Sequence, residues 1–389
     1  MIKCIHFSVK YNISYIGVII FFYFSIPKFD LVIIPGLPTG IRLQDILSLL
    51  ILLNHRIHNV VFNILKKKAF FVPLFYIIAL NCFGAILSDS LGSCIIGWFR
   101  VLQYLFVGLT CYYVFIKSNT FFVFIILLQL ALSFLQFLKV VPVFDPGRGT
   151  LLTAEYAGSF GTAAELSYFS LILAILFAMK KKKYFSFITF FIPILSGVRA
   201  YFLSIPVVII CFFQSKLIKL SFSLITVLLI VTKFSELYER TSGVYQVFYH
   251  LVIETPSELL YLKESGYQDI GDRALGHRIG KWATAIAIIS KSHFFFWGTG
   301  MYSAGGALDG GLLRMFLELG VPASLYFLFN VYRVNKLALL VFVLCNLFFD
   351  GYISSVVMPI YIAFVIFAEK EKNIKKSINI FERKHSRLV

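Results

Sequence analysis

Residues 121–144 read FFVFIILLQLALSFLQFLKVVPVF, and this stretch decides the fold class. About 20 apolar residues are enough to cross the hydrocarbon core of a bilayer as an α-helix. Apolar runs recur along most of the 389 residues, and the mean hydropathy is +0.86. Soluble domains contain about 45–50% apolar and about 25% charged residues, whereas this chain contains 59% and 14%. The sequence therefore predicts an all-α integral membrane protein.

The apolar runs predict about 12 transmembrane helices within a single membrane domain, residues 1–389. They cover residues 13–25, 41–53, 69–88, 94–116, 121–144, 161–179, 184–196, 200–213, 220–231, 312–332, 337–349 and 354–368. The short runs 184–196 and 200–213 fit either one kinked span or two helices that meet at Gly197-Val198-Arg199. We favour two helices, because the lysines before and after the pair then lie on the same side of the membrane.

The net charge of +17 is concentrated in the connections on one side of these spans. With the N-terminus inside, the inner segments carry most of the 36 Lys and Arg residues and few of the 19 acids. Cytoplasmic loops of membrane proteins are enriched in Lys and Arg. Both termini are therefore predicted to be cytoplasmic, with a basic tail at residues 369–389. This pattern accounts for the charge without nucleic-acid binding.

Two hydrophilic segments fall on the outer, periplasmic side. The larger one covers residues 232–311, and residues 278–290 within it have helical character. The smaller one covers residues 145–160. Loops as long as the first one are usually functional or disordered, and its aromatic and aliphatic residues favour an ordered, functional loop.

Several motifs for nucleotide and metal binding are missing from the sequence. The six cysteines form no CxxC pair, and there is no P-loop, no HExxH and no carboxylate pair of the DxD type. Such motifs hold metals or nucleotides. We therefore expect no metal and no cofactor. An enzyme outside the cytoplasm, where nucleotides are absent, would need an activated substrate such as a polyprenyl diphosphate sugar.

Arginines in or beside the apolar runs on the outer side are candidates for binding such a substrate, because charge at membrane depth is costly and usually functional. They are Arg42, Arg100, Arg148, Arg199, Arg273, Arg278 and Arg314. A guanidinium is always charged and binds phosphate oxygens in a bidentate manner. The alternative for each is an ion pair within the protein or snorkelling. A pair with Asp45, one helical turn away, is the expectation for Arg42.

Three residues are candidates for a general base that would accept a proton from a sugar hydroxyl. Glu165 opens the sixth span, Asp309 precedes the tenth, and His277 lies in the large outer loop. Partial burial brings a carboxylate pKa closer to the range that general bases need. The alternative for Glu165 is pairing with an arginine, and for Asp309 it is capping a helix that begins at Gly310.

The order of several short motifs resembles the conserved core of the O-antigen polymerase and ligase family. In that family an Arg-x3-Trp helix is followed by a G-x-G turn and an amphipathic helix ending in E-x-G. The corresponding residues here are Arg278-Ile-Gly-Lys-Trp282, Gly298-Thr-Gly300 and the helix that ends in Glu318-Leu-Gly320. Ser196-Gly-Val-Arg199-Ala and Arg42-Leu-Gln-Asp45 also resemble elements of the family.

The resemblance implies a metal-independent glycosyltransferase of lipopolysaccharide biosynthesis in a Gram-negative inner membrane. Ligases of the family carry His-Asn where this chain has Asp309-Gly310-Gly311, so a Wzy-type O-antigen polymerase is favoured. The substrate would be an undecaprenyl diphosphate-linked oligosaccharide, and the partners would be membrane lipid and a chain-length regulator. The diphosphate would be held by Arg148, Arg199, Arg278 and Arg314. The alternatives are an O-antigen ligase, a lipid-linked oligosaccharide flippase, and a transporter or channel.

Overall fold

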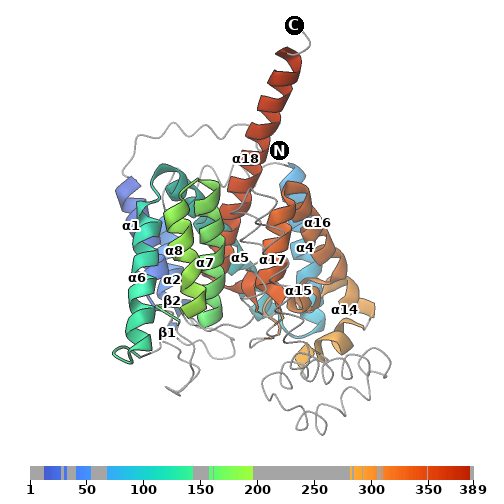
Figure 1. Ribbon diagram of the computed structural model, residues 1–389. Helices are drawn as coiled ribbons and strands as arrows, with labels where there is room; N and C mark the ends of the chain where they lie inside the picture. Colours follow the sequence, from blue (N-terminus) through green and yellow to red (C-terminus); the bar gives the residue numbers. More distant parts are fainter. Residues whose placement is uncertain are drawn as a thin grey trace, which may run out of the picture.

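The computed structural model describes residues 13–27, 30–32, 41–53, 68–142, 157–160, 162–195, 281–282, 284–290, 292–304, 308, 310–347 and 349–385. Of these residues, 81% are helical. The helices are α1 (Ile13–Ser25), α2 (Leu43–Leu52), α4 (Lys68–Leu87), α5 (Leu91–Lys117), α6 (Thr120–Phe137), α7 (Ala163–Met179), α8 (Lys183–Leu195), α14 (Ser292–Trp297), α15 (Gly311–Leu319), α16 (Val321–Val334), α17 (Lys336–Leu347), the 3-10 turn η3 (Gly351–Ile353) and α18 (Val357–His385). Most of the longer helices run along one common direction (Figure 1).

The mainly helical architecture confirms the all-α part of the predicted fold class, with one addition. Two short strands, β1 (Asp30–Val32) and β2 (Ile41–Arg42), form an antiparallel pair. The helix predicted at 41–53 therefore begins only at Leu43. The predicted spans 200–213 and 220–231, and most of the predicted loops 145–160 and 232–311, lie outside the described residues.

Two helices in the described part of the chain are long and apolar enough to cross a membrane. They are α5, with 27 residues, and α6, with 18 residues. Shorter apolar helices lie in the same bundle, among them α2, α7 and α17. The number of crossings and their direction stay predictions.

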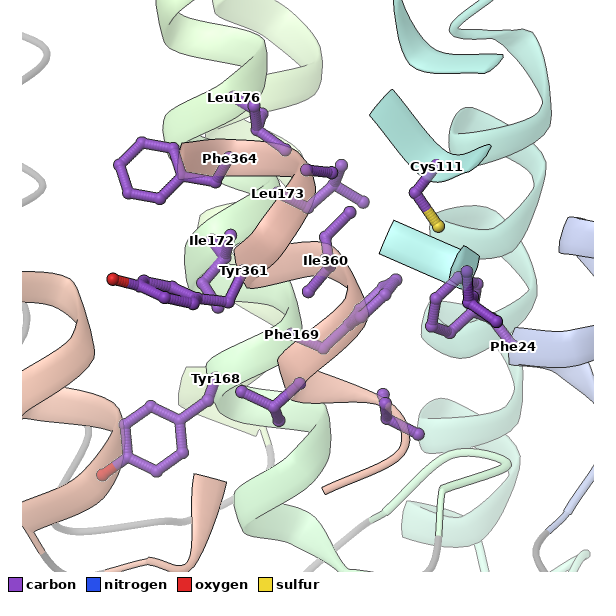
Figure 2. Close-up of a cluster of buried hydrophobic side chains, with 14 of the residues drawn as sticks. Phe24, Cys111, Tyr168, Phe169, Ile172, Leu173, Leu176, Ile360, Tyr361 and Phe364 are labelled. Carbon is purple, nitrogen blue, oxygen red and sulfur yellow. The ribbon is translucent and has the colours of Figure 1, made fainter. Parts of the chain in front are cut away.

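Helix α7 packs against α8 and α18. All of its residues from Glu165 to Phe177 are buried. A helix that is apolar on every side is expected in an interior position, and the sequence of α7 has this character. Figure 2 shows the resulting core, in which side chains of α7 and α18 meet Phe24 of α1 and Cys111 of α5.

The predicted span 312–332 is wrong as one continuous helix, because Gly320 separates α15 from α16. Gly320 has φ +81, a conformation that glycine adopts without the steric cost of a side chain. Pro322 lies in the first turn of α16, where its missing N–H has no helical partner to lose. These two residues explain locally why the helix ends and a new one begins.

The two ends of the bundle differ in charge. At one end the Lys180 ammonium donates to the carbonyl of Phe115, over 2.7 Å, and the Lys372 ammonium donates to the carbonyl of Arg333, over 3.1 Å. At the other end, the starts of α2, α7 and α15 carry Asp45, Glu165 and Arg314. The basic end of the bundle therefore lies opposite the mixed-charge end. This arrangement is the one expected when successive helices alternate in direction and the cations collect on one side.

Candidate functional site: a buried charged network

Arg314 is the centre of a group of charged side chains buried inside the mixed-charge end of the bundle. Its Nε donates to Glu318 Oε1 over 2.8 Å, and its Nη1 donates to Asp350 Oδ2 over 2.9 Å. Only 1% of Arg314, 0% of Glu318 and 6% of Asp350 is exposed. The sequence places Arg314 and Glu318 four residues apart on α15, so that they face each other on one side of the helix.

Every carboxylate oxygen in this group accepts a hydrogen bond. Glu318 Oε2 accepts one from the Tyr352 hydroxyl, and the two oxygens of Asp350 accept from the backbone N–H groups of Leu308 and Gly310. Buried ion pairs offset their desolvation only when the remaining hydrogen-bonding positions are filled. Burial raises the pKa of the Tyr352 phenol, and the Glu318 carboxylate raises it further. Tyr352 therefore remains a protonated donor.

Asp350 links this charged group to the backbone that leads into α15. Leu308 N lies 2.8 Å from Asp350 Oδ2, and Gly310 N lies 3.2 Å from Asp350 Oδ1. These two residues flank position 309, so one buried carboxylate holds the chain on both sides of a candidate general base. Gly310 is the N-cap residue of α15. Because its N–H donates to Asp350, this acid from the segment after α17 holds the start of α15 in place.

A second buried arginine lies across a tyrosine ring from the first. The guanidinium carbons of Arg100 on α5 and of Arg314 lie 5.5 Å and 5.8 Å from the centre of the Tyr302 ring. The hydroxyl groups of Tyr302 and Tyr104 both donate to the carbonyl of Ile353. Arg100 Nη2 is also 3.9 Å from Asp45 Oδ2. We name Arg100, Arg314, Glu318, Asp350, Tyr302 and Tyr352 the charged network.

Glu165 lies at the junction of two helix N-termini. The Glu165 backbone N–H donates to Thr162 Oγ1, which caps α7, and Glu165 Oε1 accepts a hydrogen bond of 2.6 Å from Ser354 Oγ. Ser354 Oγ in turn accepts from the Val356 and Val357 N–H groups at the start of α18. The Glu165 carboxyl group thus lies beside the N-terminal ends of α7 and α18, which carry partial positive charge.

The G-x-G turn predicted as a family element lies against the end of α15. Thr299 N donates to the carbonyl of Leu317, and Gly300 N donates to the carbonyl of Glu318. These contacts satisfy carbonyls at the C-terminal end of α15, which need partners outside the helix. Gly298 has φ +69, and a Cβ there would lie 2.3 Å from the Glu318 carbonyl oxygen. The glycine is thus required by close approach as well as by conformation.

Asn81 of α4 ties the same turn to the bundle. Its side-chain amide donates to the Glu318 carbonyl, and its oxygen accepts from the Trp98 indole, over 3.0 Å, and from Met301 N, over 3.1 Å. Asn81 is 1% exposed. A buried amide with this many partners fixes the relative positions of α4, α5 and the turn.

Trp282 connects the Arg-x3-Trp motif to the segment before α15. The Trp282 indole N–H donates to the carbonyl of Leu308 over 3.1 Å, and its Nε1 would lie 2.8 Å from a Cβ at Gly310. The structure adds a specific backbone contact, so three separate elements of the family resemblance meet around Leu308–Gly320.

The structure describes two of the seven predicted site residues, Glu165 and Arg314. Both are buried at the mixed-charge end of the bundle. Arg314 makes the intramolecular ion pairs that were its structural alternative. Asp45 accepts a hydrogen bond from the Arg42 backbone N–H and also pairs with Arg100, so its described contacts are a local cap and an ion pair with α5. The remaining predicted residues lie outside the described part: Arg148, Arg199, His277, Arg278 and Asp309.

Sequence reasoning missed Glu318 and Asp350. Both are acids within or directly after an apolar run, and ionisable residues at membrane depth are rare and usually paired or functional. Applying that rule to acids as well as to arginines would have found them.

Comparison with known proteins gives no relative. No protein-family model matches the chain, and no curated protein or solved structure matches it significantly.

Proposed function

We propose that the chain is an O-antigen polymerase, a metal-independent glycosyltransferase of the inner membrane whose active site faces the periplasm. The observation that carries the proposal is the packing of three motif elements into one cluster. Trp282 donates to the carbonyl of Leu308 directly before α15, and the 298–300 turn donates to carbonyls at the end of α15, so both motifs lie against the segment that ends at Gly320, next to the charged network.

In the proposed reaction, a hydroxyl oxygen on the non-reducing sugar of one lipid-linked repeat attacks the anomeric carbon of the growing glycan. The bond from that carbon to the diphosphate breaks, and undecaprenyl diphosphate leaves with the electron pair. The hydroxyl proton passes to a general base. Arg148, Arg199 and Arg278 hold the diphosphate and stabilise the charge that develops on it, in place of a metal ion.

Arg314 is a weaker candidate for holding the diphosphate than the other three arginines. Its guanidinium already binds two carboxylates and is 1% exposed, so a diphosphate would have to displace at least one of them. Arg314 is better suited to holding Glu318 and Asp350 in place, and through Asp350 the backbone at Leu308 and Gly310.

The base is proposed to be Asp309, Glu165 or His277. Glu165 is buried and accepts a hydrogen bond from Ser354 at the junction of two helix N-termini. These contacts hold its carboxyl group between the starts of α7 and α18, which favours a structural role for it. The anchored backbone on both sides of residue 309 supports Asp309 as the first candidate.

Deletion of the gene, followed by electrophoresis of the lipopolysaccharide, tests the proposal. Loss of a polymerase leaves lipid A–core carrying a single repeat unit. Loss of a ligase removes the O-antigen from the core, and loss of a flippase also removes it but leaves the repeats on the cytoplasmic side. Long O-antigen chains in the deletion strain would contradict all three assignments. We also propose a separate chain-length regulator as a partner of this protein.

A further inference from the structure

Exposed cations surround the end of the bundle opposite the charged network. We call this set the basic rim; it consists of Lys117, Lys181, Lys182, Lys183, Arg333, Lys336, Lys370 and Lys372, and each of these side chains is exposed. They come from the end of α5, the α7–α8 connection and the start of α8, the end of α16, the start of α17, and α18. Figure 1 shows these helix ends at the top of the view, where α18 leaves the bundle.

Specific contacts hold the parts of the basic rim together. The Lys180 ammonium donates to the carbonyls of Phe115 and Ile116 and so fastens the end of α7 to the end of α5. The Lys372 ammonium donates to the carbonyls of Arg333 and Val334 and fastens α18 to the end of α16. Two lysines thus cap the C-termini of α5 and α16, where the helix dipole favours cations. The exposed cations around them are left facing solvent.

Exposed aromatic side chains lie next to the basic rim. Tyr184 is 86% exposed and Tyr332 is 44% exposed. The Arg333 guanidinium carbon lies 4.7 Å from the centre of the Phe329 ring, and the Lys336 ammonium lies 5.7 Å from the centre of the Tyr332 ring. Aromatic residues collect at the headgroup level of a bilayer, and cations stacked on their rings are held at the same level.

Acidic groups do little to neutralise this surface. In the described part of the chain, the acids whose side chains lie beside the basic rim are Glu369 and Glu371, and both are half-buried. The ion pairs described for the chain join Arg100 and Arg314 to carboxylates at the other end. The basic rim therefore keeps a large excess of positive charge.

We propose that the basic rim binds the phosphate groups of anionic phospholipids. Orientation of a membrane protein requires only that cations be numerous on one side. Here they also converge from several helices, are fixed by caps on two helix C-termini and are backed by aromatic rings, which makes a defined headgroup-binding surface. The proposal requires insertion into a bilayer but not the glycosyltransferase activity, so either can fail without the other.

The test uses the full-length protein and two lipids that differ in headgroup charge. The protein is reconstituted into nanodiscs of phosphatidylcholine with an equal share of phosphatidylglycerol, extracted gently, and its retained lipids are counted by native mass spectrometry. Phosphatidylglycerol should be retained in preference to phosphatidylcholine. The preference should weaken as salt is raised, because salt screens exposed charges.

Matched variants locate the binding surface. The triple variant K181Q/K182Q/K183Q should retain at least fivefold less phosphatidylglycerol, since each basic residue near an anionic surface changes partitioning by roughly fivefold. K336Q should show a smaller loss. The control K139Q changes an exposed lysine at the opposite end of the bundle and should retain the wild-type amount.

Three results would overturn the proposal. They are equal retention of the two lipids by the wild-type protein, wild-type retention by a correctly inserted triple variant, and an equal loss in K139Q. If the triple variant does not insert correctly, K336Q and the salt dependence of the wild-type protein decide the question. A further control adds inorganic phosphate to the protein in pure phosphatidylcholine. If this phosphate stabilises the protein as much as phosphatidylglycerol does, the surface binds free phosphate instead of lipid headgroups.

Discussion

At the scale of single residues, Asp350 combines two functions, because it pairs with Arg314 and accepts hydrogen bonds from Leu308 and Gly310. Asp350→Asn keeps the side-chain shape but removes the charge and replaces one acceptor by a donor. Breaking a buried ion pair from one side costs about 3–5 kcal/mol, so we expect a clear fall in the temperature of unfolding in detergent. The control is Asp89→Asn, which changes an exposed acid. Its free energy of unfolding should lie within about 0.5 kcal/mol of the wild-type value. Equal stability of the two variants would show that the network is not structural.

Arg278 is the residue on which the proposed chemistry depends most. Arg278→Lys keeps the charge but loses the bidentate geometry, and Arg278→Ala loses both. Loss of a charge-assisted contact to the transition state costs about 2–4 kcal/mol, or roughly 30- to 1,000-fold in rate. Both variants should therefore give short O-antigen in a complementation assay at wild-type membrane levels. Normal long chains from a well-expressed Arg278→Ala protein would remove this residue from the site.

At the scale of elements, the interlocking of the 298–300 turn with the end of α15 predicts which glycines are indispensable. Gly298→Ala forces a side chain into a left-handed conformation, at a cost of about 1–2 kcal/mol, and places its Cβ 2.3 Å from the Glu318 carbonyl oxygen. We expect a large loss of monodisperse protein on size-exclusion chromatography. Gly92→Ala on α5 meets nothing within 4 Å and should behave as wild type. A normal yield of Gly298→Ala would mean that the turn can move away from α15.

The elements also show how far sequence reasoning reaches. The predicted runs 94–116 and 161–179 closely match α5 and α7, because an uninterrupted apolar run has few alternatives to a buried helix. The break at Gly320 was not predicted, since a glycine inside an apolar run is compatible with a continuous helix. It is fixed by the contact with Gly298, whose Cβ position would lie 2.5 Å from Gly320 N. The partners of Arg314 were likewise set by tertiary contacts, with Asp350 36 residues away in sequence.

At the scale of the whole molecule, the separation of a basic end from a mixed-charge end predicts the topology. Reporter fusions after Lys183, Lys219 and Lys376 should report the cytoplasm, and fusions within residues 254–272 should report the periplasm. The reason is that the cations of the basic rim favour the cytoplasmic side. A cytoplasmic signal from residues 254–272 would invert the second half of the chain and move the proposed site to the wrong side of the membrane.

The central claim is that this protein alone joins lipid-linked repeat units without nucleotide or metal. The most direct measurement incubates the purified protein in liposomes with a single undecaprenyl diphosphate-linked repeat unit and a chelator, and separates the products by size. We predict a ladder of glycans longer than one repeat, with release of one undecaprenyl diphosphate for each linkage formed. A folded, correctly inserted protein that leaves the repeat unit unchanged under these conditions, or that extends it only when a nucleotide sugar or a metal is added, would contradict the account.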